Sequence, residues 1–71
     1  MLEAKVGELA YFAWANGTQL WGTVIEITNY NGGDPTHISI TWYEACGIVT
    51  QTYGTKTAMR FINNARELLY E

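Results

Sequence analysis

Cysteine, histidine and proline are scarce in this sequence, which has one of each among its 71 residues. The single cysteine, Cys46, cannot form an internal disulfide, whereas small secreted domains usually carry several. The single histidine, His37, has no second histidine or cysteine at metal-ligand spacing. We therefore expect a cytoplasmic protein without a metal or other cofactor, in which Cys46 is partly buried and His37 is an exposed or hydrogen-bonded strand residue.

Charged residues are also few, at 15% of the chain, and seven acidic residues outnumber four basic ones. The net charge of −3 repels the phosphate backbone of nucleic acids. The bases gather in residues 45–66, where Lys56, Arg60 and Arg66 occur without an acid. No apolar run approaches the roughly 18 residues that cross a bilayer, and the acidic N-terminus is unlike a signal peptide. We expect no membrane partner, and the charge disfavours nucleic acid.

Hydrophobic residues, by contrast, make up 48% of the chain and include three Trp, five Tyr and two Phe. This composition is too apolar for a disordered segment. A chain of this length forms one domain, which we place over residues 1–71. A domain so small needs most of its apolar residues for folding.

Alternating apolar residues and turn signals predict short antiparallel strands. Four are expected, over residues 8–14, 20–28, 37–43 and 48–53. The Asn16-Gly17 pair predicts a hairpin between the first two, because both residues tolerate positive φ. Residues 29–35 and 44–47 are expected to form the later turns. Alternation in the third strand places Ile38, Ile40 and Trp42 in the core.

The second strand contains Gly22, Val24 and Ile27, a spacing that predicts a sharp bend across a small barrel. After a break at Gly54, residues 58–62 are expected to form another short strand or an extended segment. Asn63-Asn64 offers an N-cap for one helical turn, and residues 68–70 then return as an edge strand. The alternative is a helix over residues 64–70. The pattern predicts an all-β barrel of five or six short antiparallel strands with one short helical turn near the C-terminus.

The chain resembles the SH3-like barrels, and among them the small barrels encoded by bacteriophages. Four groups of residues carry the resemblance: Val6, Gly7 and Leu9; Gly22, Val24, Ile25 and Ile27; Ile38, Ile40 and Trp42; and Asn64 to Leu69. These are core and turn positions spread over most of the chain, so they imply a fold more than a function.

SH3-like barrels have several known binding roles, and the sequence fits some of these roles better than others. Peptide-binding SH3 domains have a long acidic first loop, whereas residues 15–19 here are few and uncharged. Ribosomal and transcription-factor barrels of the KOW type are usually basic, whereas this chain is acidic. Tudor-type barrels read methylated side chains with an aromatic cage, whose walls could here come from Trp14, Trp21, Tyr30, Tyr43 and Tyr53.

The aromatic residues are the first candidates for a binding site. We expect Tyr11, Trp42 and Phe61 in the core, whereas Trp14, Trp21, Tyr43 and Tyr53 either cover the barrel or form an exposed interface patch. A basic edge near Lys56 and Arg60 is a further candidate. The predicted partner-binding residues are therefore Trp14, Trp21, Tyr30, Tyr43, Tyr53, Lys56 and Arg60.

With no catalytic constellation in the sequence, we predict a non-enzymatic protein–protein interaction module. The phage resemblance implies a small virion component or a binder and inhibitor of a host protein. The alternative is a nucleic-acid-binding barrel that uses exposed aromatics and the Lys56–Arg66 segment. An edge strand, formed by residues 68–70 or 48–53, could also pair two copies into a homo-oligomer.

Overall fold

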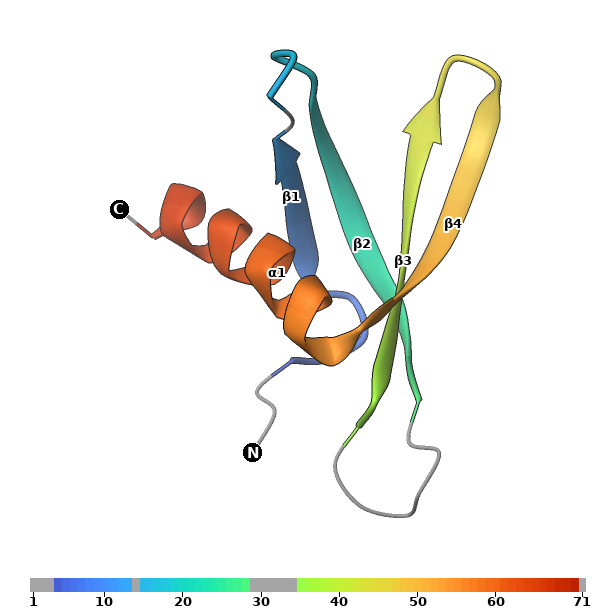
Figure 1. Ribbon diagram of the computed structural model, residues 1–71, viewed down its shortest axis with the longest axis vertical. Helices are drawn as coiled ribbons and strands as arrows, with labels where there is room; N and C mark the ends of the chain where they lie inside the picture. The colour runs from blue at the N-terminus through green and yellow to red at the C-terminus, as the bar shows by residue number, and fades with distance from the viewer. Residues whose placement is uncertain (1–3, 14, 29–34, 71) are drawn as a thin grey trace.

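A computed structural model describes residues 4–13, 15–28 and 35–70. Four strands are followed by one helix: β1 (Leu9–Ala13), β2 (Gln19–Thr28), β3 (His37–Glu44), β4 (Gly47–Gly54) and α1 (Thr55–Leu69). The strands form one antiparallel sheet in the order β1-β2-β3-β4. The helix leaves the end of β4 and crosses one face of the sheet toward β1 (Figure 1).

All four predicted strands are confirmed, with ends that differ by at most one residue. The Asn16-Gly17 hairpin is confirmed as well: Gly17 has a φ of 91°, and the Thr18 N–H donates to Asn16 Oδ1 at 3.0 Å. At the β3–β4 turn, Gly47 has a φ of 129°, a conformation that favours glycine. Of the predicted loop 29–35, residues 29–34 lie outside the described residues.

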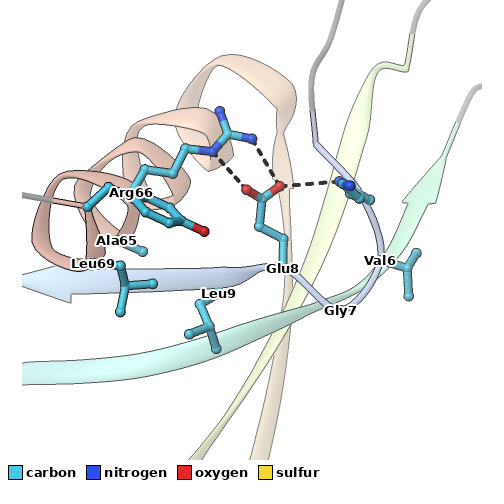
Figure 2. A pocket seen from close by; sticks show the side chains of 9 residues that line it. Val6, Gly7, Glu8, Leu9, Ala65, Arg66 and Leu69 are labelled. Carbon is cyan, nitrogen blue, oxygen red and sulfur yellow. Dashed lines mark hydrogen bonds and ion pairs between the residues drawn. The ribbon is translucent and has the colours of Figure 1, made fainter.

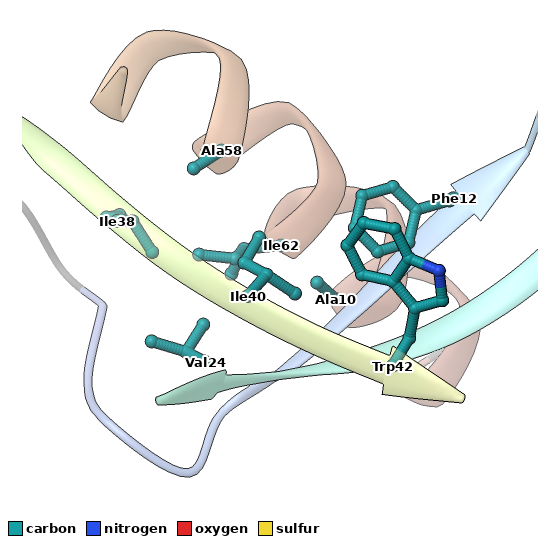
Figure 3. Close-up of a cluster of buried hydrophobic side chains, with 8 residues drawn as sticks. All are labelled: Ala10, Phe12, Val24, Ile38, Ile40, Trp42, Ala58 and Ile62. Carbon is teal, nitrogen blue, oxygen red and sulfur yellow. The ribbon is translucent and has the colours of Figure 1, made fainter. Parts of the chain in front are cut away.

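The core lies between the sheet and α1 (Figure 3). Its fully buried side chains come from every element except β4: Ala10, Phe12, Val24, Ile38, Ile40, Ala58 and Ile62. The predicted alternation in β3 is confirmed, because Ile38, Ile40 and Trp42 all point into this core. Tyr11, expected there too, is instead only half-buried, since its buried neighbours Ala10 and Phe12 occupy the helix side of β1.

The C-terminal third departs most from the sequence prediction. A strand over residues 58–62 is wrong, because α1 runs unbroken from Thr55 to Leu69. The single helical turn after Asn64 and the edge strand over residues 68–70 are wrong for the same reason. The alternative helix over 64–70 has the right type but begins nine residues late. Helical spacing accounts for the difference, because the buried residues Ala58, Ile62 and Ala65 share one face of the helix.

The sheet is open, and a barrel of five or six strands is not confirmed. The ladder between β2 and β3 begins at the pair Thr23–Thr41, and beyond it the two hairpins diverge (Figure 1). The register of β2 shifts between Val24 and Glu26, so a bulge at Ile25 marks the irregularity. Gly22, where the sequence predicts a bend, lies next to the first β2–β3 pair and is closely packed, because a Cβ atom there would lie 2.8 Å from Ile40 Cγ2.

Candidate binding surface

The sheet face opposite α1, here called the open face, carries the largest exposed apolar side chains of the sheet. Its apolar members follow from strand register and alternation: Tyr11, Trp21, Ile25, Tyr43 and Ile48. Three of them are well exposed: Tyr43 at 77%, Ile48 at 67% and Trp21 at 45%. No described helix or strand covers the part of this face that runs from Trp21 to Ile48, whereas at its β1 edge Tyr11 lines a shallow cleft together with the last turns of α1. This part of the open face therefore presents apolar surface that no described helix or strand buries.

Apolar residues cluster at two places on the open face. On one side, Tyr11 and Trp21 are cross-strand partners, with ring centroids 4.8 Å apart and ring planes at 57°. On the other, Tyr43 pairs with Ile48 next to the turn that joins β3 to β4. Tilted aromatic pairs hold each other's rotamers as well as burying area. The Tyr11 contact thus holds Trp21 in place while much of its surface stays exposed.

Hydroxyl groups line the β3–β4 part of the open face. Thr50 Oγ1 donates to Thr41 Oγ1 at 3.2 Å, and Thr41 Oγ1 donates to the Val49 carbonyl at 3.0 Å. In the next cross-strand pair on this face, the Ser39 and Thr52 hydroxyl groups are joined by a hydrogen bond of 2.9 Å. Because these hydroxyls are bonded to each other or to the backbone, this part of the face is polar but ordered.

The predicted site residues do not come together in one place. Trp21 and Tyr43 lie on the open face, whereas Tyr53 is half-buried on the helix side, against Phe12 and Phe61. Burial there raises the pKa of the Tyr53 phenol above its ordinary value of 10.0. Trp14 and Tyr30 lie outside the described residues.

The two basic candidates, Lys56 and Arg60, are exposed and lie one turn apart on α1. The helix covers the opposite side of the sheet from the open face, so the bases and the exposed aromatics occupy different surfaces. The sequence prediction does not include two apolar members of the open face, Ile25 and Ile48. Ile48 could have been found, because the two-residue turn at 45–46 fixes its pairing with Tyr43.

Cys46 and His37 lie at opposite ends of the β3–β4 hairpin. Cys46 occupies the turn and is exposed, so its expected partial burial is wrong. The cause is the short turn, which projects its residues away from the core. His37 begins β3, half-buried, with its Nδ1 3.0 Å from Thr36 Oγ1. Within residues 4–13, 15–28 and 35–70, no three His, Cys, Asp or Glu side chains are grouped so that they could hold a metal.

A cleft of about 410 Å³ lies between residues 5–9 and the last turns of α1 (Figure 2). Arg66 closes it: its Nε and Nη2 atoms donate to the two carboxylate oxygens of Glu8 at 2.7 and 3.0 Å. The Lys5 backbone N–H adds a longer contact of 3.4 Å to the same carboxylate. With its carboxylate so engaged, Glu8 serves to tie the N-terminal turn to a helix 58 residues away in sequence.

This ion pair makes stability depend on pH. Its hydrogen bonds and positive charge hold the pKa of Glu8 below the ordinary value of 4.5. Because folding lowers the pKa of Glu8, the ionised carboxylate stabilises the folded state fully at pH values above the ordinary pKa. This stabilisation is lost as the pH falls through the lowered pKa of the folded state. At neutral pH, Glu8→Gln should lower the free energy of unfolding by about 1 kcal/mol, because the pair is bidentate but partly exposed.

Urea unfolding of both forms at neutral pH and near pH 3 measures this effect. The difference between wild type and Glu8→Gln should shrink toward zero at the lower pH. The matched control is Glu26→Gln, which alters an exposed carboxylate that accepts a long hydrogen bond of 3.3 Å from Thr28 Oγ1. It should show a small difference at both pH values. A Glu8→Gln difference that stays constant with pH would contradict the role of this ion pair.

Comparison of the chain with protein-family models, with curated proteins and with solved structures gives no match. In the described part of the chain, no helix has both the length and the apolar character that spanning a bilayer requires. The class of protein is therefore given by the fold alone: a four-stranded antiparallel meander with one C-terminal helix on one face.

Proposed function

We propose that this protein is a non-enzymatic protein-binding module and that the open face is its contact surface. The observation that carries the proposal is the exposure of Trp21, Tyr43 and Ile48 on the part of the open face that no described element covers. Protein interfaces are enriched in aromatic residues, and a few such anchors supply most of the binding energy. Apolar patches on small proteins often mark such interfaces.

The resemblance to small phage-encoded SH3-like barrels supports a setting for this function. We propose a small virion component or a binder of a host protein that acts in the host cytoplasm. Both roles need a compact surface that recognises another protein, and neither needs a catalytic group. A closed SH3-like barrel stays part of this proposal, as an expectation from the resemblance.

Nucleic-acid binding is the weaker candidate. Stacking on aromatics and contacts to phosphates would have to come from one surface. Here Trp21 lies on the open face, whereas Lys56 and Arg60 lie on α1 across the sheet. The net charge of −3 also opposes association with a polyanion.

The proposal predicts that Tyr43→Glu abolishes partner binding. Purified wild type, used as bait with host-cell lysate and with disrupted virions, should recover a protein that binds stoichiometrically. A charge at an anchor that a partner desolvates should weaken recovery by at least about tenfold. Tyr43 is mostly exposed, so the variant should fold normally.

Tyr70→Glu is the matched control, because Tyr70 is equally exposed, at 82%, but follows α1 and is not part of the open face. It should recover the partner as wild type does. Equal loss in both variants, or no recovered protein that depends on Tyr43, would overturn the assignment of the open face. Salt-sensitive binding of oligonucleotides by wild type, lost on Lys56→Glu, would favour the weaker candidate instead.

A further inference from the structure

We propose that β4 pairs antiparallel with β4 of a second copy of this chain, joining two four-stranded sheets into one. This inference concerns the edge of the sheet and is independent of the function proposed for its open face. Strand β4 has one described neighbour, β3, and ends the sheet on that side. Figure 1 shows α1 leaving β4 at its C-terminal end and running toward β1, away from the free edge.

Among the residues that the structure describes, the free edge of β4 has none of the usual protection against pairing. Its eight residues, Gly47–Gly54, include no charged residue and no proline. Their register with β3 is unbroken by a bulge. Proteins generally blunt exposed edges with lysine, proline, bulges or very short strands. By contrast, the opposite edge strand, β1, has only five residues and packs closely with α1.

The hydrogen-bonding groups of this edge can be assigned from the ladder. The Thr55 N–H donates to the Thr36 carbonyl at 3.2 Å, which continues the β3–β4 pairing. Because backbone groups alternate in direction along an antiparallel strand, the odd-numbered residues of β4 bond to β3. Ile48, Thr50 and Thr52 therefore direct their N–H and C=O groups toward the free edge.

The sequence of β4 suits pairing with itself about a two-fold axis at Gln51. That axis, perpendicular to the sheet, keeps each face of one copy continuous with the same face of the other. It sets Val49 opposite the second copy's Tyr53 on the helix side, an aromatic and β-branched pair. On the open face it sets Thr50 opposite the second copy's Thr52, which extends the rows of hydroxyl groups.

Charge complementarity favours a second copy in this antiparallel orientation. One end of β4 lies beside Glu44, the partner of Gly47, and the other end leads within two residues to Lys56. Both side chains are exposed. About the axis at Gln51, the Glu44 end of each copy meets the Lys56 end of the other. A parallel arrangement would instead bring like charges together, which is unfavourable.

A charge swap at Gln51 tests the register as well as the association. Gln51 is exposed and lies opposite its own copy, so Gln51→Lys or Gln51→Glu sets like charges face to face. Sedimentation equilibrium at low salt should give wild type twice the 8.0 kDa chain mass. Each variant alone should be monomeric, and an equimolar mixture of the two should restore the dimer.

Gln19→Lys is the matched control, because Gln19 is also exposed in a strand but lies on β2, away from the β4 edge. It should dimerise as wild type does. Circular dichroism of all four proteins shows whether the monomeric variants keep their fold, and the rescue in the mixture excludes misfolding as the cause. A monomeric wild type at millimolar concentration, open-ended aggregates, or a dimer unaffected by Gln51→Lys would overturn the inference.

Discussion

Phe12→Ala is expected to remove most of the stability of this protein. Phe12 is fully buried, and its ring lies 4.3 Å from that of Phe61 and 5.0 Å from that of Trp42, measured between centroids. Tyr53 is a further ring neighbour at 6.2 Å. One side chain therefore connects β1 with β3, β4 and α1. Loss of a buried phenylalanine costs about 3–5 kcal/mol, whereas a domain of this size has roughly 4–10 kcal/mol in total.

Urea unfolding followed by tryptophan fluorescence measures the loss, since Trp42 packs against the deleted ring in a tilted arrangement. Phe12→Leu keeps most of the volume and should lose a smaller amount, about 1–2 kcal/mol, so it gives a measurable transition if Phe12→Ala does not fold. Tyr43→Ala removes an exposed aromatic and should change stability by no more than about 0.5 kcal/mol. Similar losses for Phe12→Ala and Tyr43→Ala would contradict the central place of Phe12 in the core.

Gly22→Ala is expected to destabilise the protein by about 2 kcal/mol through overpacking. A Cβ atom at Gly22 would lie 2.8 Å from Ile40 Cγ2 and 3.0 Å from both Phe12 Cε2 and the Thr41 carbonyl oxygen. Real Cβ atoms are hardly ever found so close to other heavy atoms. The carbonyl belongs to the backbone of β3, so relieving the contact requires a shift of that strand. In a small domain this loss lowers the melting temperature by roughly 10 °C.

A double-mutant cycle with Ile40→Leu separates this clash from other effects of alanine. Leucine has nearly the volume of isoleucine but lacks the Cγ2 methyl, so the double variant should recover part of the loss. Gly54→Ser is the control, because a Cβ there meets no atom within 4 Å and serine is a good N-cap for α1. It should leave stability unchanged or slightly higher. A Gly22→Ala protein as stable as wild type would show that β2 and β3 separate easily at this point.

The strands could be predicted from the sequence because their signals are local. Asn16-Gly17 specifies a tight turn, and the alternation of Ile38, Ile40 and Trp42 identifies the buried side of β3. The same reasoning failed for α1. The fully buried Ala58 and Ile62 have half-buried neighbours, Met59 and Phe61, so the buried face of the helix is wide. Over these five residues, the apolar pattern of such a helix is hard to distinguish from that of a short strand.

The candidate surface could be predicted only in part. Residue type makes Trp21 and Tyr43 candidates for a binding site, and the structure places both on the open face. Tyr53 has the same character, but register places it opposite Ile38, on the side that α1 covers. For an aromatic strand residue, composition does not reveal the face, because both a core and an interface favour such side chains.

The amino-acid sequence by itself determined where the chain turns and which residues alternate, because these depend on φ preferences and on neighbours a few positions apart. Only the tertiary structure decided that residues 55–69 form one helix, because packing of Ala58, Ile62 and Ala65 against the sheet stabilises it there. It also decided which surfaces stay open. The helix packs on one face of a single sheet, so the described elements leave most of the other face and the β4 edge uncovered.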